Sequence, residues 1–163
     1  MIIINKSGYL KYRSLKFRCA LGKSGIGNKK MEGDNITPRG IFKIIKIYYR
    51  KDRLRKLSSK FTLIEIMKNM GWCDDPKSRK YNQPINLPNG YSYEALYRKD
   101  NIYDLVLVLN YNIKPTIKNK GSAIFIHVAK KKYEKTAGCI ALKKAHLISL
   151  VKKINKNTKV IIN

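Results

Sequence analysis

Hydrophobic and polar residues alternate along parts of the chain with the period of two that is typical of a half-buried strand. The clearest case is LKFRCAL at 15–21, where the residues at positions 15, 17, 19 and 21 are all apolar. We therefore predict a strand in this segment. Cys19 lies on its apolar side and is expected to be a core residue.

Other segments are apolar on both faces, which predicts strands in the interior of a sheet. This pattern occurs in IFKIIKIYY at 41–49, YDLVLVLNYN at 103–112 and SAIFIHVA at 122–129. TKVIIN at 158–163 predicts a last strand. FTLIEIM at 61–67 fits a short strand and a helical turn equally well.

One helix is predicted near the end of the chain, because Leu147, Leu150, Val151 and Ile154 recur at the spacing of one helix face. Strands otherwise dominate, without regular strand-helix alternation, internal repeats or a linker. We predict that residues 1–163 form a single, mainly β domain with minor α content, built as a mixed β-sheet or sandwich.

The segment GWCDDPKSRKYNQPINLPNG at 71–90 contains three of the five prolines and predicts a long loop, a kind of segment that is usually functional or disordered. Loops on a β scaffold commonly carry recognition. The candidates for substrate binding are Trp72, Asp74, Asp75, Tyr81 and Asn82. The alternative is a loop that its own tryptophan and prolines lock, with Asp75 starting a turn. The sequence leaves both open.

The composition of the chain is strongly basic. The chain has 36 Lys and Arg against 10 Asp and Glu, a formal net charge of +26, which is typical of proteins that bind nucleic acid or another anionic polymer. However, 28 of the basic residues are lysines spread along the chain, whereas nucleic-acid readers favour arginine for bidentate contacts. A non-catalytic basic binding module therefore remains an alternative function, and no specific nucleic-acid partner is expected.

The start of the chain, MIIINKSGYLKYRSLKF, has an apolar run of four residues before polar residues appear. This run is too short for a signal peptide or a membrane span, so we expect a cytoplasmic protein, and a periplasmic one only if a longer precursor exists. The three cysteines include no CxxC pair and predict reduced thiols rather than a disulfide framework. The oligomeric state is open.

Nucleotide binding is not indicated, although Gly22-Lys23-Ser24 ends like a Walker A motif. The first glycine of that motif would fall at Phe17, and no helix start follows Ser24. No cofactor is expected.

The chemistry that stands out involves one of only two histidines, His127, which ends an apolar run, and Cys139, which follows in the turn Thr136-Ala137-Gly138-Cys139. A metal site would need three or four suitably spaced ligands, so no metal is expected. Simple packing explains a buried Cys or His but not three small residues before the sulfur. A thiol nucleophile explains them, with His127 as the base and backbone N–H groups of the turn as oxyanion donors.

These residues resemble the signature of the L,D-transpeptidase catalytic domain family, the YkuD-type fold: a histidine ending a strand, a loop, and then [Ser/Thr]-His-Gly-Cys. His127 and the turn from Thr136 to Cys139 match it, with Ala137 in place of the second histidine and Ala141 where the family usually has an arginine. The family's Thr-Pro-x-Gly-x-Phe motif is matched at 37–42. The resemblance covers nearly the whole chain.

The resemblance implies a cysteine-dependent enzyme that acts on peptidoglycan stem peptides or muropeptides. It implies that Cys139 attacks the carbonyl of the L-centre of diaminopimelate in a tetrapeptide stem and expels D-alanine, with His127 as the base. An aspartate at 74 or 75 could then pair with the free amine of diaminopimelate. The thioester passes to an amine, as in a transpeptidase, or to water, as in an L,D-carboxypeptidase. Similar TAGC variants lack export signals, which implies recycling of wall fragments.

Overall fold

The computed structural model describes all residues from 1 to 163. It contains fourteen strands, one α-helix and one turn of 3-10 helix, so the predicted mainly β fold is confirmed. The strands are β1 (Ile2–Asn5), β2 (Tyr9–Tyr12), β3 (Leu15–Ala20), β4 (Ile26–Gly27), β5 (Thr37–Pro38), β6 (Gly40–Tyr49), β7 (Leu63–Glu65), β8 (Met70–Cys73), β9 (Pro84–Asn86), β10 (Tyr93–Ala95), β11 (Leu105–Leu109), β12 (Phe125–Val128), β13 (Ile140–Leu142) and β14 (Lys159–Ile162). The helices are η1 (Lys131–Tyr133) and α1 (Lys144–Lys153).

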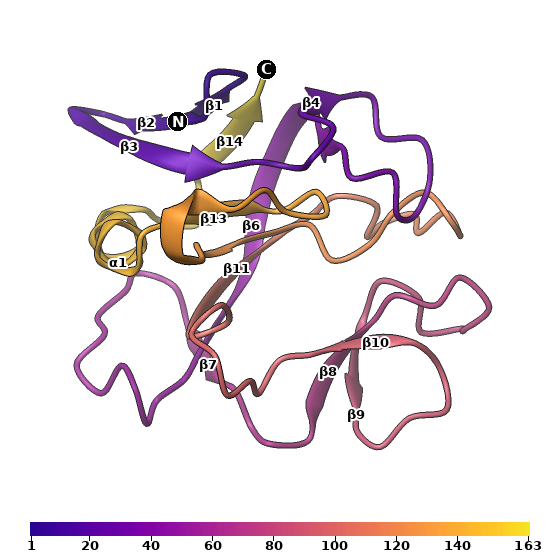
Figure 1. Ribbon diagram of the computed structural model, residues 1–163. Coiled ribbons are helices and arrows are strands. Elements are labelled where there is room, and N and C mark those ends of the chain that lie inside the picture. Colours follow the sequence, from indigo (N-terminus) through magenta and orange to yellow (C-terminus); the bar gives the residue numbers. More distant parts are fainter.

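The main sheet has nine strands in the order β11-β12-β13-β3-β2-β1-β14-β6-β7. It closes on itself because β11 also pairs with β6. The first residues of β6 pair with β14 and its last residues with β11 and β7. Figure 1 shows this long strand running through the molecule, with both chain ends on the same side, where β1 lies parallel to β14.

The periodicity of the sequence located most of these strands. The segments predicted at 15–21, 41–49, 103–112, 122–129 and 158–163 correspond to β3, β6, β11, β12 and β14, respectively, and β6 begins one residue earlier than predicted. The ambiguous segment at 61–67 forms a strand, β7, which extends the sheet beside β6. The hairpin of β1 and β2 was not predicted.

The prediction of a long loop at 71–90 is wrong in part, because the segment begins with residues of β8 and contains β9 at 84–86. β8 lies between β10 and β9 in a separate three-stranded antiparallel sheet. Each strand is short, and Pro84 opens β9, an edge position that tolerates a residue without an N–H donor. The pairing partners are distant in sequence, so the local pattern did not reveal them.

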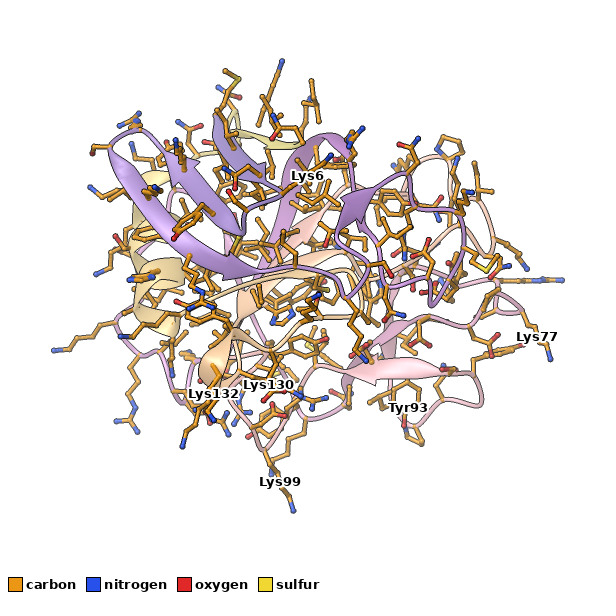
Figure 2. All side chains as sticks on the ribbon, turned by 45° about the horizontal axis from the view of Figure 1, so that its top comes forward. Lys6, Lys77, Tyr93, Lys99, Lys130 and Lys132 are labelled. Carbon is orange, nitrogen blue, oxygen red and sulfur yellow. The ribbon has the colours of Figure 1, made fainter.

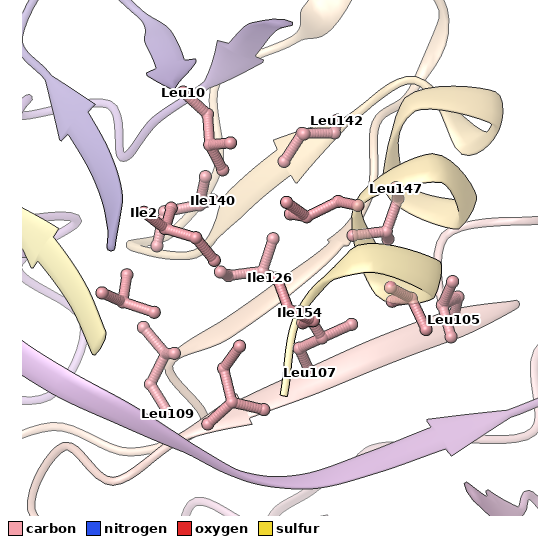
Figure 3. Packing of buried hydrophobic residues seen from close by; sticks show 14 of the residues in the cluster. Ile2, Leu10, Leu105, Leu107, Leu109, Ile126, Ile140, Leu142, Leu147 and Ile154 are labelled. Carbon is pink, nitrogen blue, oxygen red and sulfur yellow. The ribbon is translucent and has the colours of Figure 1, made fainter. Parts of the chain in front are cut away.

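The larger of two hydrophobic cores has 23 buried residues and lies between the inner face of the main sheet and α1. Figure 3 shows Leu147 of the helix facing Ile126 and Leu142 of the sheet. The predicted helix face is confirmed, because Leu147, Leu150, Val151 and Ile154 are all completely buried. This core fixes one face of β12 and β13.

The second core has eight buried residues, and it covers the opposite face of β11 and β12. In β11 the side chains alternate: Leu105, Leu107 and Leu109 belong to the first core, whereas Val106 and Val108 belong to the second. In β12, Ile126 faces the first core and Phe125 the second. Strands covered on both faces need continuous apolar sequences, which is what the sequence shows.

The lysines are distributed over the surface. In Figure 2, Lys77 and Lys99 project from different edges of the molecule, and Lys130 and Lys132 lie close together in another part of the surface. The α-helix has ten residues, and no helix is long and apolar enough to cross a lipid bilayer.

Candidate active site

The candidate nucleophile and base lie on neighbouring parallel strands. His127 is in β12, Cys139 directly precedes β13, and the register pairs His127 with Ala141. Cys139 is two residues before Ala141, so its side chain points to the same face of the sheet as that of Ala141 and therefore of His127. Cys139 packs against the second core, so this face is the one turned away from α1.

The thiol of Cys139 is held between two backbone groups. Its Sγ donates to the carbonyl oxygen of Ala123 at 3.0 Å and accepts from the N–H of Phe125 at 3.4 Å. Burial raises the pKa of the Cys139 thiol to about 12, although the hydrogen bond from Phe125 opposes this shift. The resting group at neutral pH is therefore a thiol rather than a thiolate.

The imidazole of His127 is neutral and oriented by the backbone. Its Nδ1 lies 2.9 Å from the carbonyl oxygen of Val128. Since a carbonyl can only accept, Nδ1 carries the proton and Nε2 is left as an acceptor. Burial lowers the pKa of His127 to about 4. The ring of Tyr103 packs against it edge-on, with 5.4 Å between ring centroids. At neutral pH the imidazole is therefore unprotonated and Nε2 is available as an acceptor, although burial makes it a weaker base than an exposed imidazole.

A single cleft of about 390 Å³ connects the two groups. Cys139, His127, Tyr103 and Ala141 all line it, and the small side chain of Ala141 leaves the space beside the imidazole open. No hydrogen bond joins the thiol to the imidazole, because the thiol is bonded to Ala123 instead. Hydrogen bonds between catalytic groups are often long or not yet formed before substrate binds. To transfer its proton, the thiol must turn from the Ala123 carbonyl towards His127.

The turn before Cys139 is stabilised by the side chain of Thr136. Its hydroxyl donates to the carbonyl of Cys139 at 2.6 Å and accepts from the N–H of Gly138 at 3.1 Å. The sequence predicts that the N–H groups around Gly138 and Cys139 hold an oxyanion. The N–H of Gly138 is already engaged, whereas those of Ala137 and Cys139 make no hydrogen bond within the protein.

The two sequence motifs meet behind this turn. The hydroxyl of Thr37, from the Thr-Pro motif, accepts the N–H of Gly22 at 2.8 Å. Gly22 forms an isolated parallel bridge with Thr136. Gly138 has a φ of +140°, and a Cβ there would lie 2.9 Å from the carbonyl oxygen of Ile36. The Thr-Pro motif thus supports the shape of the cysteine turn.

This close contact predicts a specific sensitivity at Gly138. We expect Gly138→Ala to lower the free energy of unfolding by about 1–3 kcal/mol more than Gly33→Ala does. Gly33 also has a positive φ, of 76°, but nothing lies within 4 Å of the position that a Cβ would take there, so it reports backbone strain alone. Urea denaturation of both variants measures the difference. Equal losses would show that the contact with Ile36 is unimportant.

The cleft is basic on the side of His127. Lys23, Arg98, Lys130 and Lys135 line it, together with Glu94 and Glu134. Arg98 pairs with Asp100 at 2.7 Å, and its guanidinium carbon lies 5.5 Å from the centroid of the Tyr103 ring. Arg98 could not be predicted from the sequence, because no motif surrounds it. Arg98 supplies a positive charge in this cleft, whereas Ala141, which stands where the family usually has an arginine, supplies none.

Three of the five candidates from the segment at 71–90 are buried, and the other two, Asp74 and Asp75, are half-buried. Trp72, Tyr81 and Asn82 are buried, with exposed fractions of 2%, 1% and 2%. The indole N–H of Trp72 donates to Oδ1 of Asn82 at 3.0 Å, which corresponds to the locked segment that the sequence left open. Asp75 accepts the N–H of Lys77 at 2.9 Å, as expected for a residue that starts a turn.

Asp74 is the member of this set that lies beside the thiol. It lines a small pocket of about 60 Å³ with Cys139, Glu32 and Glu94, and Glu94 also lines the cleft of His127. Neither glutamate was identified from the sequence, because each is isolated between unrelated residues. The structure contains no group of three His, Cys, Asp or Glu side chains that could hold a metal ion.

The neutral resting thiol predicts how Cys139 reacts with an alkylating reagent. Because its pKa is about 12, the thiolate fraction should rise about tenfold for each pH unit between pH 7 and 9. The rate of iodoacetamide labelling, followed by peptide mass spectrometry, should rise in the same proportion. A rate that levels off below pH 7 would instead indicate a preformed thiolate–imidazolium pair.

Comparison with known proteins agrees with this geometry. A search of curated proteins found no match to the chain. The family model for the L,D-transpeptidase catalytic domain (YkuD) matches residues 1–162. This match confirms the resemblance seen in the two motifs and the predicted fold. The chain therefore belongs to the L,D-transpeptidase catalytic domain family, whose enzymes use a cysteine to act on peptidoglycan peptide stems.

Proposed function

We propose that this protein removes the terminal D-alanine of peptidoglycan tetrapeptide stems, with Cys139 as the nucleophile and His127 as the base. The observation that carries this proposal is the shared cleft, which a neutral imidazole with a free Nε2 and the thiol both line. A base held in its correct tautomer by a third group is the usual arrangement for activating a nucleophile.

The reaction follows from the positions of these groups. When substrate displaces the thiol from Ala123, its proton passes to Nε2 of His127 and the sulfur attacks the carbonyl of the L-centre of diaminopimelate. The N–H of Cys139, which has no partner in the protein, is available to the oxyanion. His127 then gives its proton to the amine of D-alanine, the C–N bond breaks, and a thioester on Cys139 remains.

The position of His127 supports one direction for the substrate in this proposal. Because His127 protonates the leaving amine, D-alanine must lie in the basic cleft that His127 lines. Its free carboxylate then meets Arg98, Lys130 or Lys135, and a charge-assisted contact of this kind favours a substrate that ends at D-alanine. This supports removal of a terminal residue.

The acceptor that we propose is water, which makes the enzyme an L,D-carboxypeptidase acting on wall fragments. After D-alanine leaves, His127 takes a proton from a water molecule in the vacated cleft, and the water oxygen bonds to the thioester carbonyl. The C–S bond then breaks, the tripeptide leaves with its new carboxyl group, and His127 returns the proton to the sulfur of Cys139. An acceptor stem would have to bring its amine, cationic before it reacts, into a cleft where four basic side chains face two acidic ones and where Lys23 and Lys135 form no ion pair. Like charges in this position disfavour such an acceptor, whereas water is unaffected.

Mass spectrometry of the products tests this function. A disaccharide-tetrapeptide muropeptide is incubated with the protein or with Cys139→Ala, with and without an added D-amino acid. We expect conversion to the tripeptide form by the protein alone. Incorporation of the D-amino acid or formation of dimers would instead establish transfer to amines. If no product depends on Cys139, the protein does not act on this substrate.

A further inference from the structure

A cavity of about 680 Å³ lies beside the catalytic cleft, and the proposed reaction does not use it. The cavity and the cleft share Ile102, Lys130 and Glu134. We call the cavity the lysine pocket, because five lysines line it: Lys130, Lys131, Lys132, Lys143 and Lys144. Like charges repel, so gathering these side chains around one cavity is unfavourable unless an anion lies between them.

The acidic side chains of the lysine pocket do not supply that anion. Asp100 and Glu134 are the two that line it. Both carboxylate oxygens of Asp100 accept hydrogen bonds from the guanidinium of Arg98, at 2.9 and 2.7 Å. Glu134 pairs with Lys130 at 3.2 Å. Each acidic side chain is therefore already matched with one basic partner.

Three of the five lysines have no anionic partner. Lys144 pairs with the buried carboxylate of Asp104 at 2.7 Å. Lys131, Lys132 and Lys143 are exposed and form no ion pair in the structure. Since an ammonium group carries three N–H donors, these side chains can bind an anion with several oxygen atoms.

The start of α1 adds positive charge to the same cavity. The first N–H groups of a helix have no partner within it and carry a partial positive charge. Serine, threonine or aspartate usually cap them. Here the N-cap is Lys143, no side chain caps the helix, and the first turn contains no acidic residue. Lysines at this end repel the helix dipole, whereas a bound anion would stabilise both the lysines and the helix.

The backbone beside these lysines is strained. Lys132 and Tyr133 are consecutive residues with positive φ, of 65° and 55°, which is unfavourable for residues other than glycine. The guanidinium carbon of Arg18 lies 4.8 Å from the centroid of the Tyr133 ring and packs on it. Strain of this kind is often retained at functional sites. Here it accompanies the turn that places three consecutive lysines, at 130–132, around the cavity.

We propose that the lysine pocket binds a soluble small molecule that carries a diphosphate group. The phosphate oxygens meet Lys131, Lys132, Lys143 and the first N–H groups of α1. A phosphate monoester carries about 1.5–2 negative charges near neutral pH, so two linked phosphates match three unpaired lysines better than one phosphate does. The volume leaves room for an organic group, which Ile102 and Tyr133 contact from the wall of the cavity.

This inference does not rest on the proposed function. Cys139 and His127 line the neighbouring cleft, and neither lines the lysine pocket. Binding of a diphosphate can therefore be measured without turnover of any substrate, and its failure would leave the proposed reaction untouched.

Calorimetric titration of the full chain with inorganic pyrophosphate tests the inference. At constant ionic strength, we expect pyrophosphate to bind at least about tenfold more tightly than sulfate. The double variant Lys131→Gln/Lys132→Gln should weaken the binding of pyrophosphate at least about tenfold. Both side chains are exposed, so the variant is expected to fold, which circular dichroism verifies.

Lys152→Gln/Lys153→Gln is the matched control. These lysines are also adjacent and exposed, they form no ion pair, and they lie at the other end of α1. The change in net charge is the same, and the affinity for pyrophosphate should stay within about twofold of the unaltered protein. Equal losses in the two double variants would show that pyrophosphate responds to the overall charge of the protein, which overturns the inference. Equal binding of pyrophosphate and sulfate, or no binding, also overturns it.

Two esters distinguish the sources of the diphosphate. A soluble sugar diphosphate should bind at least as tightly as pyrophosphate, because its organic group adds contacts with the wall of the cavity. Sedimentation with phosphatidylcholine vesicles that contain a lipid diphosphate should be the same for both double variants. If only Lys131→Gln/Lys132→Gln reduced this sedimentation, the diphosphate would belong to a lipid, and the soluble ligand would be ruled out.

Discussion

Cys139→Ala is expected to abolish D-alanine release from a tetrapeptide muropeptide, and His127→Ala to lower kcat/KM about 10²- to 10⁴-fold. The first change removes the sulfur that forms the thioester. The second removes the acceptor at Nε2 that the Val128 carbonyl keeps free. Release of D-alanine is measured by a coupled assay, and circular dichroism verifies that each variant is folded.

His146→Ala is the matched control for the histidine. His146 stacks on Phe17 with 4.5 Å between ring centroids and is not among the residues that line the cleft. We expect its kcat/KM to stay within about threefold of the unaltered protein, since substitutions away from the site rarely act on the reaction. If His127→Ala retained a similar rate, another group would have to be the base.

Asn82→Ala is expected to lower the free energy of unfolding by about 2–4 kcal/mol. Asn82 is 2% exposed, and its Oδ1 accepts from the indole of Trp72 and from the N–H of Ala123, both at 3.0 Å. Its Nδ2 donates to the carbonyls of Tyr111 and Asn112, at 3.1 and 2.7 Å. Alanine would leave four polar groups without this partner, one of them the buried indole N–H of Trp72.

Asn119→Ala is the control that separates the loss of the Asn82 hydrogen bonds from the cost of backbone strain. Asn82 and Asn119 both have a positive φ, of 57° and 64°, which costs alanine more than asparagine. Asn119 is exposed and makes no side-chain hydrogen bond. Its replacement should therefore cost less than about 1 kcal/mol in urea denaturation. Similar losses in the two variants would show that the hydrogen bonds of Asn82 contribute little.

The role of Asn82 extends to the thiol. Asn82 accepts the N–H of Ala123, and the carbonyl of Ala123 accepts the thiol of Cys139 at 3.0 Å. The segment at 71–90, which the sequence indicated only as a candidate for recognition, thus positions the chain segment that contacts Cys139. Asp74 of the same segment lines a small pocket beside Cys139.

Much of the fold could be predicted, because burial imposes local patterns. The strands β11 and β12 are covered on both faces and have continuous apolar sequences, and α1 shows its buried face at regular spacing. The sheet of β8, β9 and β10 could not be predicted, because its strands have three or four residues and depend on partners far along the chain.

The candidate site was predictable only where a motif spans consecutive residues. The turn at 136–139 and the histidine at the end of a strand could be read directly from the sequence. Arg98, Glu32 and Glu94 could not, because each is a single charged side chain on a separate segment, and only the folded chain brings it to Cys139. Only the folded structure shows that the hydroxyl of Thr136 accepts a hydrogen bond from the N–H of Gly138.

Mass spectrometry of the acyl-enzyme tests the central claim most directly. The protein is mixed with the tetrapeptide muropeptide, quenched in acid within the first turnovers, digested and mapped. The account predicts an adduct on the peptide that contains Cys139, with the mass of the tripeptide muropeptide less one water, and its absence in Cys139→Ala. Release of D-alanine without this adduct, or an adduct on Cys19 or Cys73, would contradict Cys139 as the nucleophile.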